Sequence, residues 1–352
     1  MTDHESAAKL LQTAEALLVR QNQILARLNT LSIPTVPSET EANRIDTFRE
    51  RLYYRDFPLG EAEMPDFRAR FLRLVDGLDE ASVQTVVLAL NRLRKIRSTE
   101  ERYLPLYSDA ELKEYRENRE RLSQELIRLS EDCWYYRGRM LPEADFEASV
   151  FADGCGLRYL EHPERFAERD IIDAGAYIGD SALVFSPLTD ARVWAFEPTA
   201  ENYAKLLKTI ELNQLTNVVP CRIALGKEKG SAEMAKSMIA SVHTQIPNSA
   251  VPYTGSETVE VTTLDSFVAE NGLNVGLIKV DVEGAEQLLL QGALETIRRM
   301  KPALLFSIYH NADDFFCIKP ILEELGLGYR FRIRHPAIGT VLTETMLIAE
   351  TQ

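Results

Sequence analysis

At residues 170–181 the chain reads Asp-Ile-Ile-Asp-Ala-Gly-Ala-Tyr-Ile-Gly-Asp-Ser, a short apolar run that leads into two spaced glycines. The apolar run has the length and the β-branched character of a buried strand. Gly175 permits a tight turn after Asp173, and Gly179 lets the next helix begin close to a ligand. The segment therefore predicts a strand, a glycine turn and a helix, the unit from which α/β sheets are built.

The same alternation continues beyond this segment. Further apolar runs lie at 191–196, 217–224, 276–282, 303–309, 329–333 and 340–348, and helical patterns lie at 200–212, 284–299 and 318–325. This pattern predicts a mostly parallel, doubly wound, Rossmann-like α/β sheet within residues 151–352. A short turn at Ile338–Gly339 separates the last two runs, so we expect an antiparallel hairpin at one edge. Ligands of such sheets bind at the carboxyl ends of the strands.

A carboxylate ends the second strand. Glu197, in Trp-Ala-Phe-Glu-Pro, follows Asp173 by 24 residues. In nucleoside-binding sheets an acid at this point accepts hydrogen bonds from both ribose hydroxyls. The alternative is an exposed glutamate before a helix that begins at a proline. The position of Glu197 relative to the glycine turn favours the ribose-binding interpretation.

The charges near the turn restrict the class of ligand. Only Gly175 and Gly179 remain of a G-x-G-x-x-G dinucleotide fingerprint, and the Lys and Ser/Thr of a phosphate-binding P-loop are missing. Asp173 and Asp180 would repel a pyrophosphate, so a cationic or hydroxyl-rich ligand is expected. A nicotinamide oxidoreductase therefore remains only a less favoured alternative.

A later strand carries four charged groups toward its carboxyl end. Residues 277–286 read Leu-Ile-Lys-Val-Asp-Val-Glu-Gly-Ala-Glu, with Lys279, Asp281, Glu283 and Glu286 as the charged residues. Carboxylates this close at a sheet edge repel one another unless a cation, a donor or a proton is shared. The pattern therefore indicates a functional site.

These motifs, in this order, resemble those of FkbM-type methyltransferases over about residues 170–335. The resemblance rests on the 173–179 turn, Phe196-Glu197-Pro198, Ala224-Leu225-Gly226, Thr263-Leu264-Asp265-Ser266-Phe267 and Ile278–Glu286. It implies a seven-stranded methyltransferase sheet, S-adenosylmethionine as donor, and methylation of a hydroxyl oxygen on a sugar, glycan or natural product. One departure from the wider methyltransferase pattern is Tyr177, which replaces the middle glycine of the loop.

The acidic residues near the glycine turn are compatible with S-adenosylmethionine, which carries a sulfonium cation and a ribose diol but no phosphate. We expect Asp173 near its amino-acid end and Glu197 on the ribose, and the resemblance implies that Ala224 and Leu225 flank the adenine. The complete predicted cofactor set is Asp173, Gly175, Ala176, Tyr177, Gly179, Asp180, Ser181, Glu197, Ala224, Leu225 and Asp281.

Methyl transfer to a hydroxyl gains most from alignment and from timely loss of the hydroxyl proton. His310, after the fifth strand, has a pKa range suited to a base at neutral pH, although a histidine at a strand end is often structural. Asp281 and Glu283 are the other candidate bases, and Lys279 shapes the local charge. The clustered carboxylates leave a bound divalent metal open as an alternative, but no metal ligand is assigned, because His310 would be the single nitrogen donor and the spacing is not diagnostic.

The acceptor is not specified by these motifs. Substrate choice should depend on the insertion Lys236–Glu257 and on the N-terminal half. His243 and Tyr253 in the insertion are candidate acceptor contacts, although loop exposure is the default interpretation. A non-catalytic scaffold that binds the cofactor and recruits a partner is the alternative function. The intact strand-end carboxylates favour the enzyme.

The N-terminal half has a different pattern. Residues 7–31 form a heptad with one polar position, Gln21, which predicts a coiled-coil oligomer over residues 1–32 or, alternatively, a helix that packs on its own chain. Residues 33–150, after a proline-containing linker, predict a helical module. Ser108 and Glu111 form a capping-box signature for a long helix toward Tyr136. A basic cluster at residues 92–97 indicates a solvated helix face; a site for an anionic substrate is the less favoured alternative.

Composition narrows the class of protein further. The 352 residues carry 40 Lys and Arg against 54 Asp and Glu, a net charge of −14, with 45% hydrophobic residues. These values predict a soluble globular chain, and the acidic surface disfavours nucleic acid as a partner. No apolar run approaches the length of a membrane span, and the first thirty residues do not resemble a secretory signal. Four dispersed cysteines predict reduced thiols and a cytoplasmic location.

Overall fold

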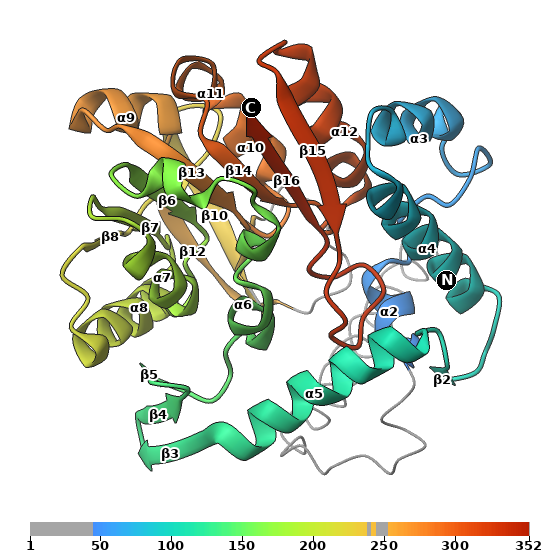
Figure 1. Ribbon diagram of the computed structural model, residues 1–352, viewed down its shortest axis with the longest axis horizontal. Coiled ribbons are helices and arrows are strands. Elements are labelled where there is room, and N and C mark those ends of the chain that lie inside the picture. The colour runs from blue at the N-terminus through green and yellow to red at the C-terminus, as the bar shows by residue number, and fades with distance from the viewer. Residues whose placement is uncertain (1–44, 238–240, 244–252, 352) are drawn as a thin grey trace, which may run out of the picture.

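A central seven-stranded sheet organises the computed structural model, which describes residues 45–237, 241–243 and 253–351 (Figure 1). The strand order is β15-β16-β14-β13-β6-β7-β8, and within this sheet only β16 runs against its neighbours. The doubly wound sheet and the antiparallel pairing of its last two strands are thus confirmed, but β16 begins at Met346 and not at residue 340, so the connection is longer than the predicted short turn. The strands are β6 (Asp170–Ala174), β7 (Val193–Phe196), β8 (Val218–Cys221), β13 (Val275–Val280), β14 (Ala303–Ser307), β15 (Tyr329–Arg334) and β16 (Met346–Thr351).

Helices cover both faces of the sheet, which explains why its strands are continuous apolar runs. Ile171 and Leu277 pack on one face with α6, α7 and α8, whereas Ile172 and Ile278 pack on the other with α9 to α12. The helices of the first face are α6 (Ala148–Asp153), α7 (Asp180–Phe185) and α8 (Ala200–Asn213). Those of the second are α9 (Leu264–Asn271), α10 (Glu286–Gln291), α11 (Leu294–Met300) and α12 (Ala312–Glu324).

The order of connections reverses next to β6. The chain passes from β6 to β7 and β8 on one side, and later places β13 and β14 on the other side of β6. Connections that diverge in this way leave a crevice at the carboxyl ends of the strands. The glycine turn after β6 lies at this point.

A second, four-stranded sheet flanks the crevice and was not predicted. Its order is β11-β10-β12-β9, and it contains the described residues of the predicted insertion 236–257. His243 ends β11 and Tyr253 begins β12, so within the described residues both belong to strands rather than to a loop. The strands are β9 (Ala224–Leu225), β10 (Gly230–Ser237), β11 (Ser241–His243) and β12 (Tyr253–Thr262).

Helices from the N-terminal half extend the helical layer that covers one face of the sheet. α4 packs on β15 and α3 packs on α12. Leu74 and Leu90 therefore share a continuous buried core with Phe315 and Ile333. The elements before α5 are β1 (Ile45–Asp46), α2 (Thr47–Tyr53), α3 (Phe67–Val75), α4 (Glu80–Arg97) and β2 (Tyr103–Leu104).

The basic cluster on α4 ties this half of the molecule together. Arg92 is buried and makes two hydrogen bonds to Glu111, at 2.8 and 2.7 Å. Arg94 donates to the Leu59 carbonyl, and Arg97 pairs with Glu63 at 3.0 Å. Arg92 thus faces inward, whereas Arg94 and Lys95 are exposed, so the solvated-face interpretation holds for part of the cluster. The internal contacts of the guanidinium groups disfavour an anion site.

The long helix α5 (Asp109–Glu125) begins as predicted but ends early. Its capping box between Ser108 and Glu111 is present. The predicted continuation to Tyr136 is wrong, because β3 (Leu126–Ser130) and β4 (Cys133–Tyr136) form an antiparallel pair there. Alternating apolar residues and adjacent aromatics favour strands in this stretch. The remaining elements are β5 (Arg139–Leu141) and the 3₁₀ turns η1 (Leu157–Tyr159), η2 (Pro163–Phe166) and η3 (Ser186–Leu188).

Two further predictions concern the N-terminal heptad and membrane-spanning segments. The heptad at residues 7–31 lies outside the described residues and stays a prediction. Among the helices of the described ranges, none is both long and apolar enough to cross a membrane.

Candidate active site

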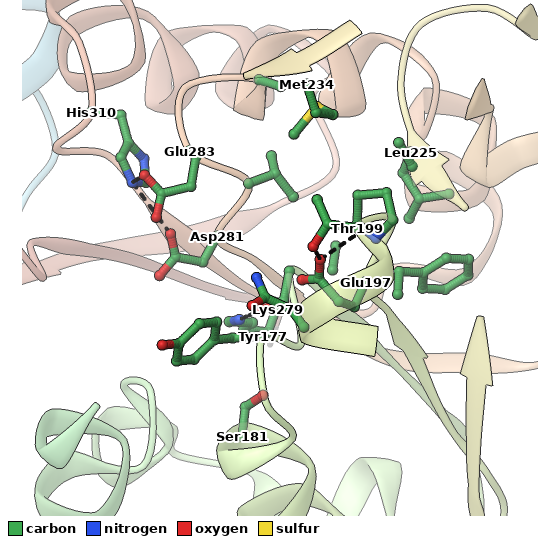
Figure 2. Close-up of a pocket in the computed structure, with 18 of the residues that line it drawn as sticks. Tyr177, Ser181, Glu197, Thr199, Leu225, Met234, Lys279, Asp281, Glu283 and His310 are labelled. Carbon is green, nitrogen blue, oxygen red and sulfur yellow. Dashed lines mark hydrogen bonds and ion pairs between the residues drawn. The ribbon is translucent and has the colours of Figure 1, made fainter. Parts of the chain in front are cut away.

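A cavity of about 930 Å³ lies over the carboxyl ends of β6, β7 and β13. Gly175, Glu197 and Asp281, which directly follow these three strands, all line it. Figure 2 shows its two sides, with Glu197 and Leu225 toward one end and Asp281, Glu283 and His310 toward the other. The strand ends singled out in the sequence are thus brought together in one site.

The glycines of the turn serve packing more than ligand approach. Gly175 has φ +80°, and a Cβ there would lie 1.7 Å from the Asp281 carbonyl oxygen. Gly179 has φ +89°, and its Cβ would lie 2.9 Å from Leu206 of α8. The prediction that Gly179 lets a helix start close to a ligand is therefore wrong, since the space it leaves is taken by α8. Neither Gly179 nor Ala176 lines the cavity.

Asp173 lies beneath the cavity floor and does not line it. Its side chain is fully buried, accepts a hydrogen bond from Ser181 Oγ at 2.7 Å, and lies 3.3 Å from Lys279 Nζ. Lys279 also donates to the Gly175 carbonyl at 2.7 Å. Burial alone would lower the pKa of Lys279, but nearby carboxylates raise it above its usual value. The charged Lys279 therefore fixes the turn from below.

Glu197 lies at the end of β7 with its carboxylate toward the cavity (Figure 2). Oε1 accepts hydrogen bonds from the Thr199 amide at 3.0 Å and from Thr199 Oγ1 at 2.6 Å. Burial raises the pKa of Glu197 to about 7. Both Thr199 bonds use Oε1, so Oε2 keeps capacity to accept from a ligand.

Next to Glu197 the wall is largely apolar. Ala224, Leu225 and Met234 line it from the second sheet. Tyr177 borders the cavity on the turn with φ +47°, and Asp180 follows it at the start of α7. Asp180 is buried and accepts from the Glu147 amide at 3.0 Å, and burial raises its pKa to about 6.

The opposite end is strongly acidic. His310 is 5% exposed, with Nδ1 3.0 Å from Glu286 Oε1, and Nε2 3.5 Å from both Asp281 and Glu283. The Nδ1 contact lies outside hydrogen-bond geometry, so it is an ion pair without a well-formed hydrogen bond. Burial would lower the pKa of His310, but the surrounding carboxylates raise it well above 6.5. The imidazole therefore holds a proton at neutral pH, which disfavours its predicted role as a base.

Glu283 has a surface that faces the cavity. Its side chain is 33% exposed. The surrounding walls still desolvate the carboxylate, because this exposure is toward the cavity, and its pKa is raised to about 7. Its backbone has φ +58°, a left-handed conformation that directs the side chain from the loop after β13.

Three residues of this end were missed in the sequence. Glu147, Tyr309 and Glu344 line the cavity, and oxygens of Glu147, Asp281 and Glu344 lie within 4.8 Å of one another. Tyr309 donates to Glu344 at 3.2 Å. Burial, followed by repulsion from Asp281, raises the pKa of Glu344 to about 8. Only Tyr309 carried a sequence signal, as the neighbour of His310 at a strand end.

Comparisons with known proteins point to one activity. Residues 173–332 match the family model described as a methyltransferase FkbM domain. Methyltransferase 1 of Beauveria bassiana (strain ARSEF 2860) is 25% identical over 235 residues, covering 58% of this chain and 89% of that protein.

Solved structures of methyltransferases are also similar to this chain. Methyltransferase FkbM from Methylobacillus flagellatus KT has 22% identity and a TM-score of 0.49, covering 82% of this chain and 60% of that one, less than two-thirds of its length. SMU.1697c from Streptococcus mutans in complex with SAH has 12% identity and a TM-score of 0.32, covering 52% and 87%. The family model and the curated relative agree, and this chain is a methyltransferase whose residues 173–332 match the FkbM domain model.

Proposed function

We propose that the enzyme transfers the methyl group of S-adenosylmethionine to a hydroxyl of a sugar, glycan or natural product. The observation that carries the proposal is Glu197, a buried strand-end carboxylate whose Oε2 has acceptor capacity toward a large cavity. A ribose diol offers two hydroxyl donors that match such a carboxylate.

The residues around Glu197 fit this donor. The glycine turn carries no Lys or Arg, and its cavity-facing acid, Asp180, disfavours phosphate groups. We assign the ribose to Glu197, the adenine to the wall formed by Ala224 and Leu225, and the amino-acid end to the side of Gly175 and Asp281. When bound, S-adenosylmethionine supplies an electrophilic methyl group on a sulfonium ion.

The acidic end then receives the acceptor. Carboxylates at Glu147 and Glu344 can accept hydrogen bonds from several hydroxyls, and Tyr53 and Tyr54 add aromatic rings to the same lining. This combination of carboxylates and rings suits a hydroxyl-rich acceptor. The described cysteines are all unpaired, in keeping with the cytoplasmic location that is part of this proposal.

Glu344 is the base that we assign to the acceptor hydroxyl. Its pKa of about 8 leaves roughly a tenth of the carboxylate ionised at pH 7, and this ionised form is a stronger base than an ordinary glutamate. Glu344→Gln should lower turnover by roughly 100-fold or more and leave the affinity for S-adenosylmethionine within a few-fold of the parent. Unchanged turnover would exclude Glu344 as the base.

Calorimetric titration tests the donor site. The parent should bind S-adenosylmethionine and not NAD. Glu197→Ala should weaken that binding by about 10- to 100-fold, because a charged acceptor for two hydroxyls is lost. Glu201→Ala, a 68% exposed carboxylate on α8, is the matched control and should bind as the parent does. Parent-like affinity of Glu197→Ala, or binding of NAD instead, would refute the donor assignment.

A further inference from the structure

His310 is the buried group that the proposed reaction leaves unused. Both of its ring nitrogens are buried without a hydrogen-bond partner, and its side chain is 95% enclosed. Polar atoms in such a position are rarely left without a partner in folded proteins. The charged groups paired with its nitrogens are carboxylates, from Asp281, Glu283 and Glu286, and the Tyr309 ring packs on the imidazole with centroids 4.1 Å apart.

The two nitrogens have different surroundings. Nδ1 faces Glu286, whose Oε1 is held by the Val282 amide at 2.8 Å. Nε2 points toward Asp281 Oδ1 and Glu283 Oε2, at 3.5 Å from each (Figure 2). Glu286 is fully buried and away from the cavity, whereas Asp281 and Glu283 line it. One side of the ring is thus anchored and the other faces two oxygens at the cavity wall.

We propose that His310 Nε2, Asp281 and Glu283 bind a divalent cation. Nε2 lies 3.5 Å from one oxygen of each carboxylate, a separation that two ligands of one ion can have at bond lengths of about 2.1–2.2 Å. Donor atoms of Asp281, His310 and the neighbouring Glu286 lie within 4.8 Å of one another. A mixture of imidazole and carboxylates suits Mn²⁺ or a similar transition metal. Glu286, the ion-pair partner of Nδ1 at 3.0 Å, occupies the place of the carboxylate that commonly orients a ligating histidine. Binding of the ion replaces the imidazole proton, which leaves to solvent.

Electrostatics favour this occupant over an empty cluster. Asp281, Glu283 and Glu286 gather negative charge around one imidazole, and Lys279, the nearby cation, already contacts Asp173. A divalent ion would offset part of this repulsion. On the proposed function, the ion would lie next to the acceptor end and make a bound hydroxyl more acidic.

Titration of the full-length protein with Mn²⁺ alone, followed by electron paramagnetic resonance and calorimetry, tests the site. One ion per chain should bind with release of a proton. His310→Gln and Asp281→Asn should each weaken binding by at least about 10-fold, and Glu286→Gln by about 10- to 100-fold. No donor or acceptor is present, so the result does not depend on the proposed function.

Glu344→Gln is the discriminating control. Its carboxylate belongs to the neighbouring group with Glu147 and Asp281, so the Mn²⁺ affinity should stay within a few-fold of the parent. Circular dichroism verifies that each variant is folded, and Glu283→Gln provides a partly exposed ligand variant that is easier to accommodate. Absence of Mn²⁺ binding at millimolar concentration, or loss in Glu344→Gln but not in His310→Gln, would overturn the proposal.

Discussion

Glu197, which we assign to the donor ribose, lowers the stability of the fold. Burial raises its pKa to about 7 from the ordinary 4.5. A carboxylate that must be ionised to accept two hydroxyls is thus held where ionisation is unfavourable. Thr199, which donates two hydrogen bonds to it, offsets part of this penalty. The ligand-binding residue is therefore also a source of instability.

This conflict predicts how stability depends on pH. The folded protein binds the Glu197 proton more tightly than the unfolded chain does. The contribution of this proton to the free energy of unfolding therefore falls as pH rises from about 4.5, and it is gone above about pH 7. Glu197→Gln should therefore be more stable than the parent above pH 7, by up to about 3 kcal/mol, and equally stable near pH 4.5. Urea unfolding at both values measures this, with Glu201→Gln as the surface control. A pH-independent difference would contradict it.

Three residues with a strained backbone also line the cavity. Tyr177, Glu283 and Glu344 have positive φ although none is glycine, and all three line the cavity. Such conformations cost of order 1–3 kcal/mol each and persist where the surrounding structure enforces them. Arg137, Cys155, Gln214 and Lys301 also have positive φ and do not line the cavity, so positive φ accompanies the site without defining it.

The turn between β6 and α7 depends on how closely it packs on β13. Gly175→Ala would place a methyl group 1.7 Å from the Asp281 carbonyl, in addition to the cost of φ +80°. Gly272, after α9, has φ +64° and no atom within 4 Å of a Cβ, so Gly272→Ala isolates the backbone cost of about 1–2 kcal/mol. Gly175→Ala should lose clearly more stability in thermal unfolding. Equal losses would show that the turn moves freely away from β13.

Sequence patterns predicted elements whose signals are local. β6 and α8 were placed closely because a buried strand and an amphipathic helix have characteristic periods. The end of α5 was misplaced because a residue with helical neighbours can join a strand when a partner strand pairs with it. The second sheet was missed, since its pairing joins strands whose alternation is weak.

The candidate site divides in the same way. Glu197, Asp281 and His310 follow strands that share one sheet, so their convergence could be predicted from topology. Glu147 lines the cavity from the loop between β5 and α6, and Glu344 lines it from the connection before β16. No spacing in the sequence relates these two positions, because tertiary packing brings them together.

At the scale of the whole molecule, the N-terminal helices and the sheet form one core. Deletion of residues 1–150 would expose the faces of β15 and α12 that α4 and α3 cover, so the remaining fragment should be unfolded or aggregated. Deletion of residues 1–44 removes none of these contacts and should preserve cooperative thermal unfolding. Circular dichroism with heating compares the two. A stable fragment 151–352 would show that the sheet folds alone.

The predicted heptad is tested by the mass of the assembly. If residues 7–31 form a coiled coil, light scattering should give an oligomer for the full chain and a monomer after deletion of residues 1–32. Equal masses would indicate a helix that does not associate.

The place of β16 has a consequence for how the protein is made. Residues 346–351 lie between β14 and β15, so these earlier strands have no shared neighbour until that segment leaves the ribosome (Figure 1). Chains emerge N-terminal end first, and β14 then presents an open edge during synthesis. Glu344 reaches its place only with the connection that precedes this strand. A nascent chain can therefore form the end of the cavity around Glu197 before Glu344 reaches the other end.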